Sequence, residues 1–447
     1  MTHSDQTARG PLAMNRRRFA TGVAATAAGA AAITAGPAAL RASAQDATTV
    51  TFWQFNTEDF IIAAWQTAID GFQAANPDVT INMEIVPWAE QHQKLVTGLA
   101  TGGLPDVSML GNNVVAEFQA LGALAPMGEY FTQWSTEAGS DVTADFWPGD
   151  VLYYNLAGDW YASPVAEETR CVYYRKDLFT AAGLGADAPA TFDQMRDFAL
   201  ALTSGDTYGI GIPGGINYGT VQTFMSVYLG YGARMLNDDG TCGFDSPEFR
   251  QALTWYTNLY AVDKVTPPDS PTYDNETLTQ LFIDGRLAMT IQSPAFWAQL
   301  QAANPSFLAD VGISQVPSGP AGRFGFLGGW PLVLWKTAKN PEAAFRWIRF
   351  ATDPQGALPQ LATTISNIPG RRSLASQAPW NTAPLNVFAQ QMEVAYPYQY
   401  PSPAIAQMGT LEVDAVQTAV QNVMLGQQSV DEATVALVQR VNDTLSR

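Results

Sequence analysis

The sequence predicts an α/β protein with two or three domains, and three observations support this prediction. The chain has 447 residues, which is too many for one hydrophobic core. Apolar residues make up 47% of it and charged residues 14%, as is typical of folded globular proteins. After residue 45, strand-like and helix-like hydrophobic patterns alternate along the chain.

Residues 1–44 are expected to be an export signal and not part of the fold. Arg16 and Arg17 form a twin arginine ahead of an uncharged run over 19–40, and the small residues 42–44 follow as a cleavage pattern. This arrangement is typical of a Tat-type signal, which is an address and not an anchor. The uncharged run is rich in alanine, glycine and threonine, so it is too weakly apolar for a transmembrane helix.

The mature protein is therefore expected to be soluble and exported, in the periplasm or outside the cell. No cysteine lies near the cleavage pattern, so no lipid anchor is expected. Translation starts at Met1 or at Met14, and the sequence leaves both open.

Residues 48–121 are expected to form a parallel sheet with right-handed crossovers. Strands are predicted at 48–55, 79–85 and 106–110. Each is followed by apolar residues at helical spacing, which gives the order β-α-β-α-β-α. Ligands bind beyond the carboxyl ends of such strands. The loops at 53–56 and 110–113 are therefore candidate binding loops.

A second α/β region is expected from residue 161 onward. It contains a strand at 286–292 and a strand-rich piece at 324–335. An amphipathic helix is expected after Asn340, and the chain is expected to end in two helices around Gly426.

The composition excludes several kinds of partner. The net charge is −18, and nucleic acids and anionic membranes bind basic surfaces, so neither is expected to bind this chain. Two cysteines and two histidines leave little material for metal or redox chemistry, so no metal and no cofactor are expected. Cys171 and Cys242 are expected to be two lone buried thiols, although an oxidising compartment would permit a disulfide between them.

Residues 324–331 have the sequence FGFLGGWP, in which two glycines precede a tryptophan within a strand-like run. Glycine in a strand often marks close approach of a ligand or of another backbone. Tryptophan has a large apolar face. The pattern therefore indicates a flat, close-packed contact at Trp330.

Six motifs in this order resemble the sugar-type family of extracellular solute-binding proteins, relatives of maltose-binding protein that serve ABC importers. The match runs over nearly all of 46–447. The motifs are VTFWQF (50–55), FQAANPDVTINMEIVPWAEQHQKLVTGLATGGLPDV (72–107), PVAEETRCVYYRKDLF (164–179), LTQLFIDGRLAMTIQSPAFW (278–297), RFGFLGGWPLVLWKTAKNPEAAFRWIRFAT (323–352) and NIPGRRS (367–373).

The resemblance implies the two-lobed periplasmic binding protein fold of type II. Each lobe would be a mostly parallel sheet flanked by helices, with the ligand cleft between the lobes. The N-terminal lobe would comprise 45–165 and 318–375, and the C-terminal lobe 166–317 and 376–447. The lobes would close on a sugar like a hinge.

Two loops of the first lobe match sugar contacts of the family. The loop after the first strand contributes Trp53, Phe55 and Asn56. The loop after the third strand contributes Asn112 and Asn113, for which helix capping is an equal alternative because both stand just ahead of an apolar helix.

Two segments that cross between the lobes supply the next contacts. At the first crossing Glu168 matches an acidic sugar contact, and Arg170 points the same way along an extended segment. The alternative is a simple ion pair between them. At the second crossing Gly328 and Gly329 would bring bare backbone close to the sugar, and Trp330 would stack on it. The alternative is a bulge that packs Trp330 into the core.

The remaining contacts match the family less closely. Trp297 is favoured over Phe296 as a stacking ring, and Arg371 over Arg372 as a donor to a sugar hydroxyl. A further stacking ring is expected from Tyr396, Tyr398 or Tyr400.

The resemblance implies an exported substrate-binding protein of an ABC importer. It would capture a sugar or polyol, from a monosaccharide to an oligosaccharide, and close around it. Its partners would be a membrane permease and, as a further partner, a chemoreceptor. It would act as a monomer, with no cofactor and no catalysis.

Two other hypotheses stay open. A secreted glycoside hydrolase or lyase would need two carboxylates at a set separation, and Glu168 is the only acid that the sequence lets us assign to the cleft. A binding protein for another solute, such as glycerol phosphate, could hold the phosphate with Arg170 and Arg371.

Overall fold

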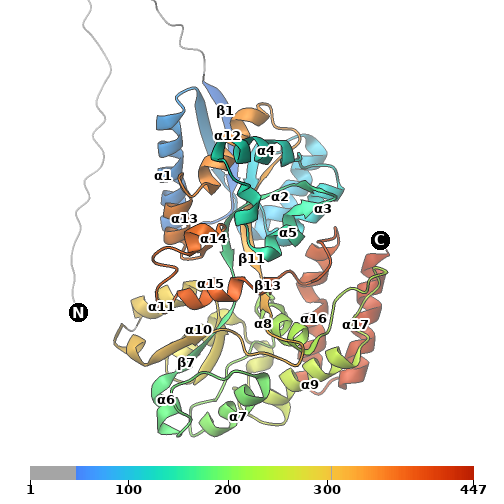
Figure 1. The fold of residues 1–447 in the computed structure, drawn as a ribbon. Helices are drawn as coiled ribbons and strands as arrows, with labels where there is room; N and C mark the ends of the chain where they lie inside the picture. The colour runs from blue at the N-terminus through green and yellow to red at the C-terminus, as the bar shows by residue number, and fades with distance from the viewer. Residues whose placement is uncertain (1–46, 304, 447) are drawn as a thin grey trace, which may run out of the picture. The chain divides into compact units, whose positions relative to one another are not determined.

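Two larger β-sheets and the helices around them make up the described part of the chain (Figure 1). The computed structural model describes residues 47–303 and 305–446, apart from the side chains of 412–414. The predicted export signal and both alternative start positions lie outside these described residues.

The first sheet has six strands in the order β12-β6-β11-β3-β1-β2. The strands are β1 (Thr48–Gln54), β2 (Val79–Ile85), β3 (Val107–Met109), β6 (Ser163–Glu168), β11 (Gly328–Leu334) and β12 (Ile368–Pro369). β1 pairs in parallel with β2 and β3, which confirms the parallel sheet predicted for the first three strands. β11 runs antiparallel to both β3 and β6.

Helices cover both faces of this sheet. They are α1 (Asp59–Ala75), α2 (Trp88–Thr101), α3 (Val115–Ala120), α4 (Gly128–Ala138), α5 (Pro148–Tyr154), α12 (Pro341–Thr352), α13 (Leu358–Ile365) and α14 (Arg372–Ala375), with 3₁₀ turns η1 (Asn112–Val114) and η2 (Val142–Asp145). Neighbouring strand residues point to opposite faces. Phe52 contacts Trp65 of α1 and Trp347 of α12, whereas Trp53 lies under Lys94 of α2. α1 and α12 therefore cover one face, and α2 covers the other.

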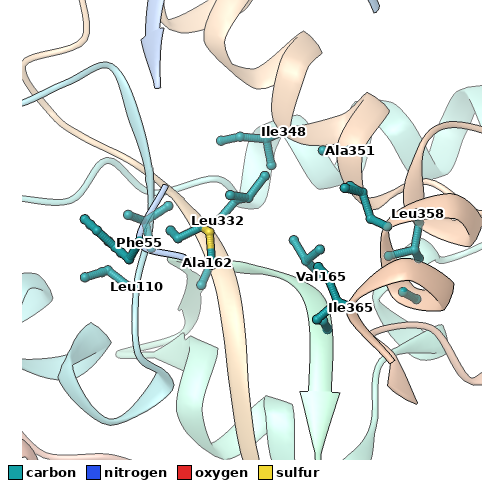
Figure 2. Close-up of a cluster of buried hydrophobic side chains, with 14 of the residues drawn as sticks. Phe55, Leu110, Ala162, Val165, Leu332, Ile348, Ala351, Leu358 and Ile365 are labelled. Atoms are coloured by element: carbon teal, nitrogen blue, oxygen red, sulfur yellow. The ribbon is translucent and has the colours of Figure 1, made fainter. Parts of the chain in front are cut away.

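An aromatic cluster anchors the first of these faces. The rings of Phe52 and Trp65 are 5.0 Å apart, those of Phe52 and Trp347 are 5.6 Å apart, and all three side chains are fully buried. Figure 2 shows the neighbouring apolar core, in which Val165 of β6 and Leu332 of β11 lie beside side chains of α12 and α13. Burial of this kind supplies about 1.5–3 kcal/mol for each large apolar side chain.

The chain leaves the first sheet along β6 and returns along β11. Only Thr169 and Arg170 separate β6 from β7 (Cys171–Arg175), the first strand of the second sheet. On the return, β10 (Gly325–Phe326) precedes β11 and pairs with β13 (Ala395–Tyr396). The two crossings run in opposite directions, which is why β6 and β11 pair antiparallel.

The second sheet has the order β8-β7-β9, with β8 (Met289–Gln292) and β9 (Val311–Ser314) on either side of β7. Both of these pairs are antiparallel, although a mostly parallel sheet was expected. Isolated parallel bridges join Thr191 to Ser318, Tyr208 to Leu287 and Gly211 to Thr290. β7 continues the outward crossing and β9 leads into the return, so the two must run in opposite directions.

Most of the helices around the second sheet come from the middle and the end of the chain. They are α6 (Lys176–Ala181), α7 (Phe192–Leu202), α8 (Tyr218–Tyr231), α9 (Pro247–Ala261), α10 (Asn275–Ile283), α11 (Ala295–Ala303), α15 (Asn386–Met392), α16 (Met408–Met424) and α17 (Val430–Leu445). α16 and α17 confirm the helix pair predicted around Gly426, and they pack against α8 and α9 (Figure 1). The predicted lobe boundaries stay a prediction.

Three simple expectations concern the whole of the described chain. Cys171 and Cys242 are both free and buried, which confirms the prediction of two lone thiols. Burial raises the pKa of the Cys242 thiol to about 11. None of the helices described here has the length and apolar character needed to span a bilayer. No group of three metal-ligating side chains is found among the described residues either.

Candidate ligand-binding site

A cavity of about 840 Å³ lies where elements of the two sheets meet. α2, η1, α3, β6 and β11 line one side, and α8, β10, Tyr398 and α16 line the other. Half of the twelve predicted site residues belong to this lining, namely Asn112, Asn113, Glu168, Gly328, Gly329 and Trp330. The other half do not line it, namely Trp53, Phe55, Asn56, Arg170, Trp297 and Arg371. For all twelve residues the role in ligand binding stays a prediction.

The glycine pair has a different role on each face of β11. Gly328 is paired with Glu168 and Gly329 with Glu167. A Cβ atom at Gly328 would lie 2.7 Å from the Phe326 ring and 2.8 Å from Cγ of Glu168, on the cavity side. A Cβ atom at Gly329 would overlap the carboxyl group of Glu167, which is fully buried. Glycine is therefore favoured at both positions, because Phe326 and Glu168 fill the space beside Gly328 and Glu167 fills the space beside Gly329.

Trp330 lies half-buried at the cavity wall, two residues from Gly328 and hence on the same face of the strand. Its ring is 6.0 Å from that of Trp88, at 38° between the planes. Trp88 in turn packs on Phe55, at 5.4 Å. A register shift follows between Trp330 and Pro331. The strand is therefore irregular here, as the bulge alternative required, but the tryptophan faces the cavity.

Asn112 and Asn113 lie in η1, directly beyond the carboxyl end of β3. The Asn112 side chain donates through Nδ2 to the carbonyl of Leu327, at 3.2 Å. The residues at the N-caps are Gly111 for η1 and Val114 for α3, and neither position has a side-chain capping hydrogen bond. Helix capping is therefore not what these asparagines do in this structure.

Glu168 forms an ion pair with Arg170, as the alternative to separate ligand contacts foresaw. Nη1 of Arg170 donates to Oε2 of Glu168 at 3.0 Å, and Nη2 donates to Oε1 at 3.3 Å. The Glu168 side chain is 21% exposed and lines the cavity, whereas that of Arg170 is 5% exposed and stands behind the lining.

The loop after β1 lies outside the cavity because it folds back on itself. Gln54 donates to the Asn56 carbonyl at 2.7 Å and accepts from the Asn56 amide at 2.9 Å. Phe55 is fully buried beneath Trp88, which takes its place in the lining. Trp53 points to the other side of α2, where the Lys94 ammonium lies 4.4 Å from its ring in a separate groove of about 580 Å³.

Arg371 is an internal brace in this structure. Its Nε donates to the Thr352 carbonyl at the end of α12, and its Nη1 donates to the Val142 carbonyl in η2. The guanidinium lies 4.2 Å from the Phe146 ring, and burial lowers its pKa to about 10. Arg372 pairs instead with Glu393 near the surface.

The predicted aromatic contacts of the second lobe divide in the same way. Trp297 packs half-buried against the core, and the Phe296 ring lies 4.7 Å from that of Tyr173, at 59° between the planes. The rings of Tyr396 and Tyr400 contact each other at 4.0 Å, tilted by 34°. Of the three tyrosines offered as alternatives, Tyr398 is the one in the cavity lining, with its ring 5.6 Å from Phe326.

Several lining residues were not singled out from the sequence. They are Trp88, Gln91 and His92 of α2, Glu117 of α3, Tyr218 and Gln222 of α8, and Phe326 of β10. A signal for the first group was available, because β2 is parallel to β1 and ends at the same edge of the sheet. The loop beyond 85 was therefore a third candidate loop. Residues 88, 91 and 92 share one helical face.

The charges in the lining are few and paired. His92 and Glu117 are joined by a 2.9 Å hydrogen bond between Nε2 and Oε1, and Glu168 is held by Arg170. No lysine or arginine is found among the described residues that line the cavity. The wall is therefore aromatic and polar, with no free cation to attract an anionic ligand.

A pair of buried acidic residues lies behind the cavity, on the opposite face of β6. Asp150 and Glu167 are both fully buried, and the Tyr154 hydroxyl donates to Glu167 at 3.5 Å. Burial raises the pKa of each carboxyl group well above its usual range, and for Glu167 the nearby Asp150 raises it further. At least one of the two is therefore expected to carry a proton in the folded protein.

Sequence comparison finds relatives over most of the chain. Residues 59–358 match the family model described as bacterial extracellular solute-binding protein. A protein of Brucella abortus is 30% identical over 282 residues, which are 62% of this chain and 66% of that protein, just under two thirds of its length. A mannitol-binding protein of Pseudomonas aeruginosa is 27% identical over 90% of this chain and 94% of its own.

Two solved structures have the same fold. The sugar-binding protein MalE of Xanthomonas citri is 28% identical, with a TM-score of 0.77 over 89% of this chain and 98% of its own. An ABC transporter solute-binding protein of Thermotoga lettingae, bound to α-D-tagatose, is 26% identical, with a TM-score of 0.75 over 89% and 100%. These matches confirm the predicted two-lobed periplasmic binding protein fold.

Replacing Glu167 by glutamine should change how stability depends on pH. A carboxyl group whose pKa is raised on folding stabilises the protein fully below its usual value of 4.5, and this contribution is lost as the pH rises through the raised pKa. In that range the wild-type free energy of unfolding should fall by up to about 1.4 kcal/mol per pH unit for each proton involved. The free energy of unfolding of Glu167→Gln should fall less over this range. The stability of the variant relative to the wild type should therefore rise with pH.

Denaturant unfolding at several pH values above 4.5 measures this difference. The same substitution at Glu90, which is exposed on α2, controls for the loss of a surface charge. An equally steep fall in wild type and Glu167→Gln would contradict the prediction.

Proposed function

The chain belongs to the bacterial extracellular solute-binding protein family, and from this premise we propose that it captures a neutral sugar or polyol for an ABC importer. The observation that carries the proposal is the composition of the cavity wall. The half-buried ring of Trp330 lies on the same face of β11 as Gly328, which pairs with Glu168. An aromatic face covers the apolar C–H surface of a sugar, and a carboxylate accepts hydrogen bonds from its hydroxyl groups. The mannitol-binding relative and the tagatose-bound neighbour support the same class of ligand.

The pairing of charges favours a neutral ligand over a phosphate ester. Arg170 and Arg371 were the two candidate phosphate ligands. Arg170 is occupied by Glu168, and Arg371 is buried among backbone carbonyls away from the cavity. A dianionic phosphate placed beside Glu117 and Glu168 would meet two carboxylates and no free cation.

The cavity volume is compatible with several ligand sizes. At about 840 Å³ it falls within the usual range of about 300–1,000 Å³ for small-molecule sites. We therefore keep the ligand class as a mono- to oligosaccharide or a polyol. The lining comes from β6 and β11 of the first sheet and from α8 and α16 beside the second sheet. A ligand would therefore contact both sides only when these elements are together, and binding would favour that state.

The proposal extends to the biology of the chain. The twin arginine at Arg16 and Arg17 would direct export, and the mature protein would act outside the cytoplasm as a monomer without a lipid anchor. It would dock on a membrane permease, and a chemoreceptor is a further partner. The lobes would follow the boundaries expected from the sequence, 45–165 with 318–375 and 166–317 with 376–447.

A binding role is also proposed over catalysis. The cavity holds a second carboxylate that the sequence did not point to, Glu117, so the two acids required for glycoside hydrolysis are present. Glu117 is tied to His92 and Glu168 to Arg170, and both carboxylates are thereby held as acceptors. Release of reducing sugar with turnover from an oligosaccharide would overturn this part of the proposal.

A thermal-shift screen of the mature chain tests the ligand class. The panel contains D-mannitol, D-tagatose, maltose, maltotriose, glycerol 3-phosphate and a polyamine. A neutral sugar or polyol should raise the melting temperature saturably, because a ligand that binds only the folded state stabilises it by mass action. A rise in melting temperature with glycerol 3-phosphate alone, or with the polyamine alone, would contradict the proposal.

Replacing Trp330 by alanine should weaken binding of the ligand found in that screen by about 2 kcal/mol or more, because a buried aromatic contact is lost. Isothermal titration calorimetry gives the affinity. Trp160→Ala is the matched control, since Trp160 is a half-buried tryptophan outside the lining, and it should leave the affinity unchanged. Equal losses in the two variants would argue against stacking on Trp330.

Replacing Arg16 and Arg17 by lysine should abolish export and leave the uncleaved precursor in the cytoplasm, because a Tat-type signal depends on its arginine pair. Cell fractionation and the mass of the exported chain measure the outcome. Normal export and cleavage of the lysine variant would show that another pathway reads the leader.

A further inference from the structure

One buried guanidinium joins three parts of the cavity wall. Arg170 donates to Glu168 of β6 through both terminal nitrogens, and its Nη2 also donates to Oε1 of Gln222 in α8, at 2.5 Å. Its guanidinium carbon lies 5.2 Å from the ring of Phe326 in β10. Glu168, Gln222 and Phe326 all line the cavity, whereas Arg170 does not.

The arginine determines which end of the Gln222 amide faces the cavity. A guanidinium group has donors and no acceptor, so the atom that faces it must be the amide oxygen. Nδ2 of Asn275 also points to this oxygen, at 3.5 Å. With Oε1 held by Arg170, the Nε2 donors of Gln222 are left for groups in the cavity that this residue lines.

The same arginine leaves Glu168 with acceptor capacity only. An ionised carboxylate has about four lone-pair positions and no proton to donate. Arg170 occupies one on each oxygen, and the others remain for groups in the cavity. The wall therefore presents a hydrogen-bond acceptor, Glu168, next to a hydrogen-bond donor, Gln222, and both are oriented by one residue behind them.

We infer that Arg170 is a positioning residue that makes the site selective for an uncharged diol, whose one hydroxyl donates to Glu168 while the neighbouring oxygen accepts from Gln222. The inference rests on the proposed function and deepens it. It also replaces the direct contact between Arg170 and ligand that the sequence suggested, because a side chain that is 5% exposed and bonded to two lining residues has little surface to offer.

The first arm of the test needs no ligand. The side-chain amide signal of Gln222, identified by its loss in Gln222→Ala, is recorded by NMR on ¹⁵N-glutamine-labelled mature protein. Arg170→Lys and Arg170→Met should both shift this signal, because neither keeps the forked donor that holds Oε1. Arg175→Met is the matched control, since Arg175 is a neighbouring arginine paired with Asp177, and it should leave the signal in place. An unmoved Gln222 signal in both Arg170 variants would overturn the inference.

The second arm measures affinity for D-mannitol, D-tagatose and maltose by calorimetry. For each that binds the wild type, Arg170→Lys and Gln222→Ala should each weaken binding about tenfold or more, the scale of one hydrogen bond to a charged group. The double variant should be no weaker than Arg170→Lys within about threefold, because the two residues act through one arrangement. Losses that multiply to about a hundredfold would mean independent ligand contacts and would overturn the positioning role.

The two arms separate this inference from the proposed function. If the wild type binds none of the neutral ligands, the proposed function fails, and the NMR arm still decides whether Arg170 orients Gln222. If the wild type binds a sugar but the Gln222 amide signal is unchanged in both Arg170 variants, only the inference about Arg170 fails. Arg170→Lys keeps the positive charge beside Glu168, so it provides a folded variant if Arg170→Met does not fold.

Discussion

The antiparallel pairing of β6 with β11 is the constraint on which the rest of the structure depends. These strands carry the chain out of the first sheet and back into it, and they place Gly328 opposite Glu168 and Gly329 opposite Glu167. The pairing tolerates no side chain at either glycine, because the two glutamates occupy the space on alternate faces. The cavity wall and the buried acidic pair behind it are therefore two faces of one strand pair.

The two glutamates solve different electrostatic problems. Glu168 at the cavity is paired with Arg170, and that ion pair leaves the carboxylate oriented and the wall close to neutral. Glu167 is buried beside Asp150, so its carboxyl group is favoured in the protonated form. A wall of this kind suits a ligand with many hydroxyl groups and no net charge. The described lining contains no unpaired positive charge that would attract a phosphate ester.

The sequence anticipated the residues whose position follows from strand order and register. Trp330, Glu168 and the glycine pair lie on crossing strands, and their approach to the cavity follows once those strands pair. Trp53 does not line the cavity, because the loop beyond β1 folds back through Gln54 and Trp88 covers Phe55, and its role in binding stays a prediction. Arg371 matched a family motif, yet two backbone carbonyls bind it inside the first lobe.

The sequence by itself determined the α/β class, the parallel start of the first sheet, the two lone thiols and the family. Hydrophobic period and motif order are local properties of the chain, so they need no knowledge of distant contacts. Only the tertiary structure decided that Gln222 belongs to the wall and that Arg170 stands behind it. Gln222 lies on a helix 52 positions along the chain from Arg170, and a hydrogen bond over that separation exists only once α8 has packed beside β7.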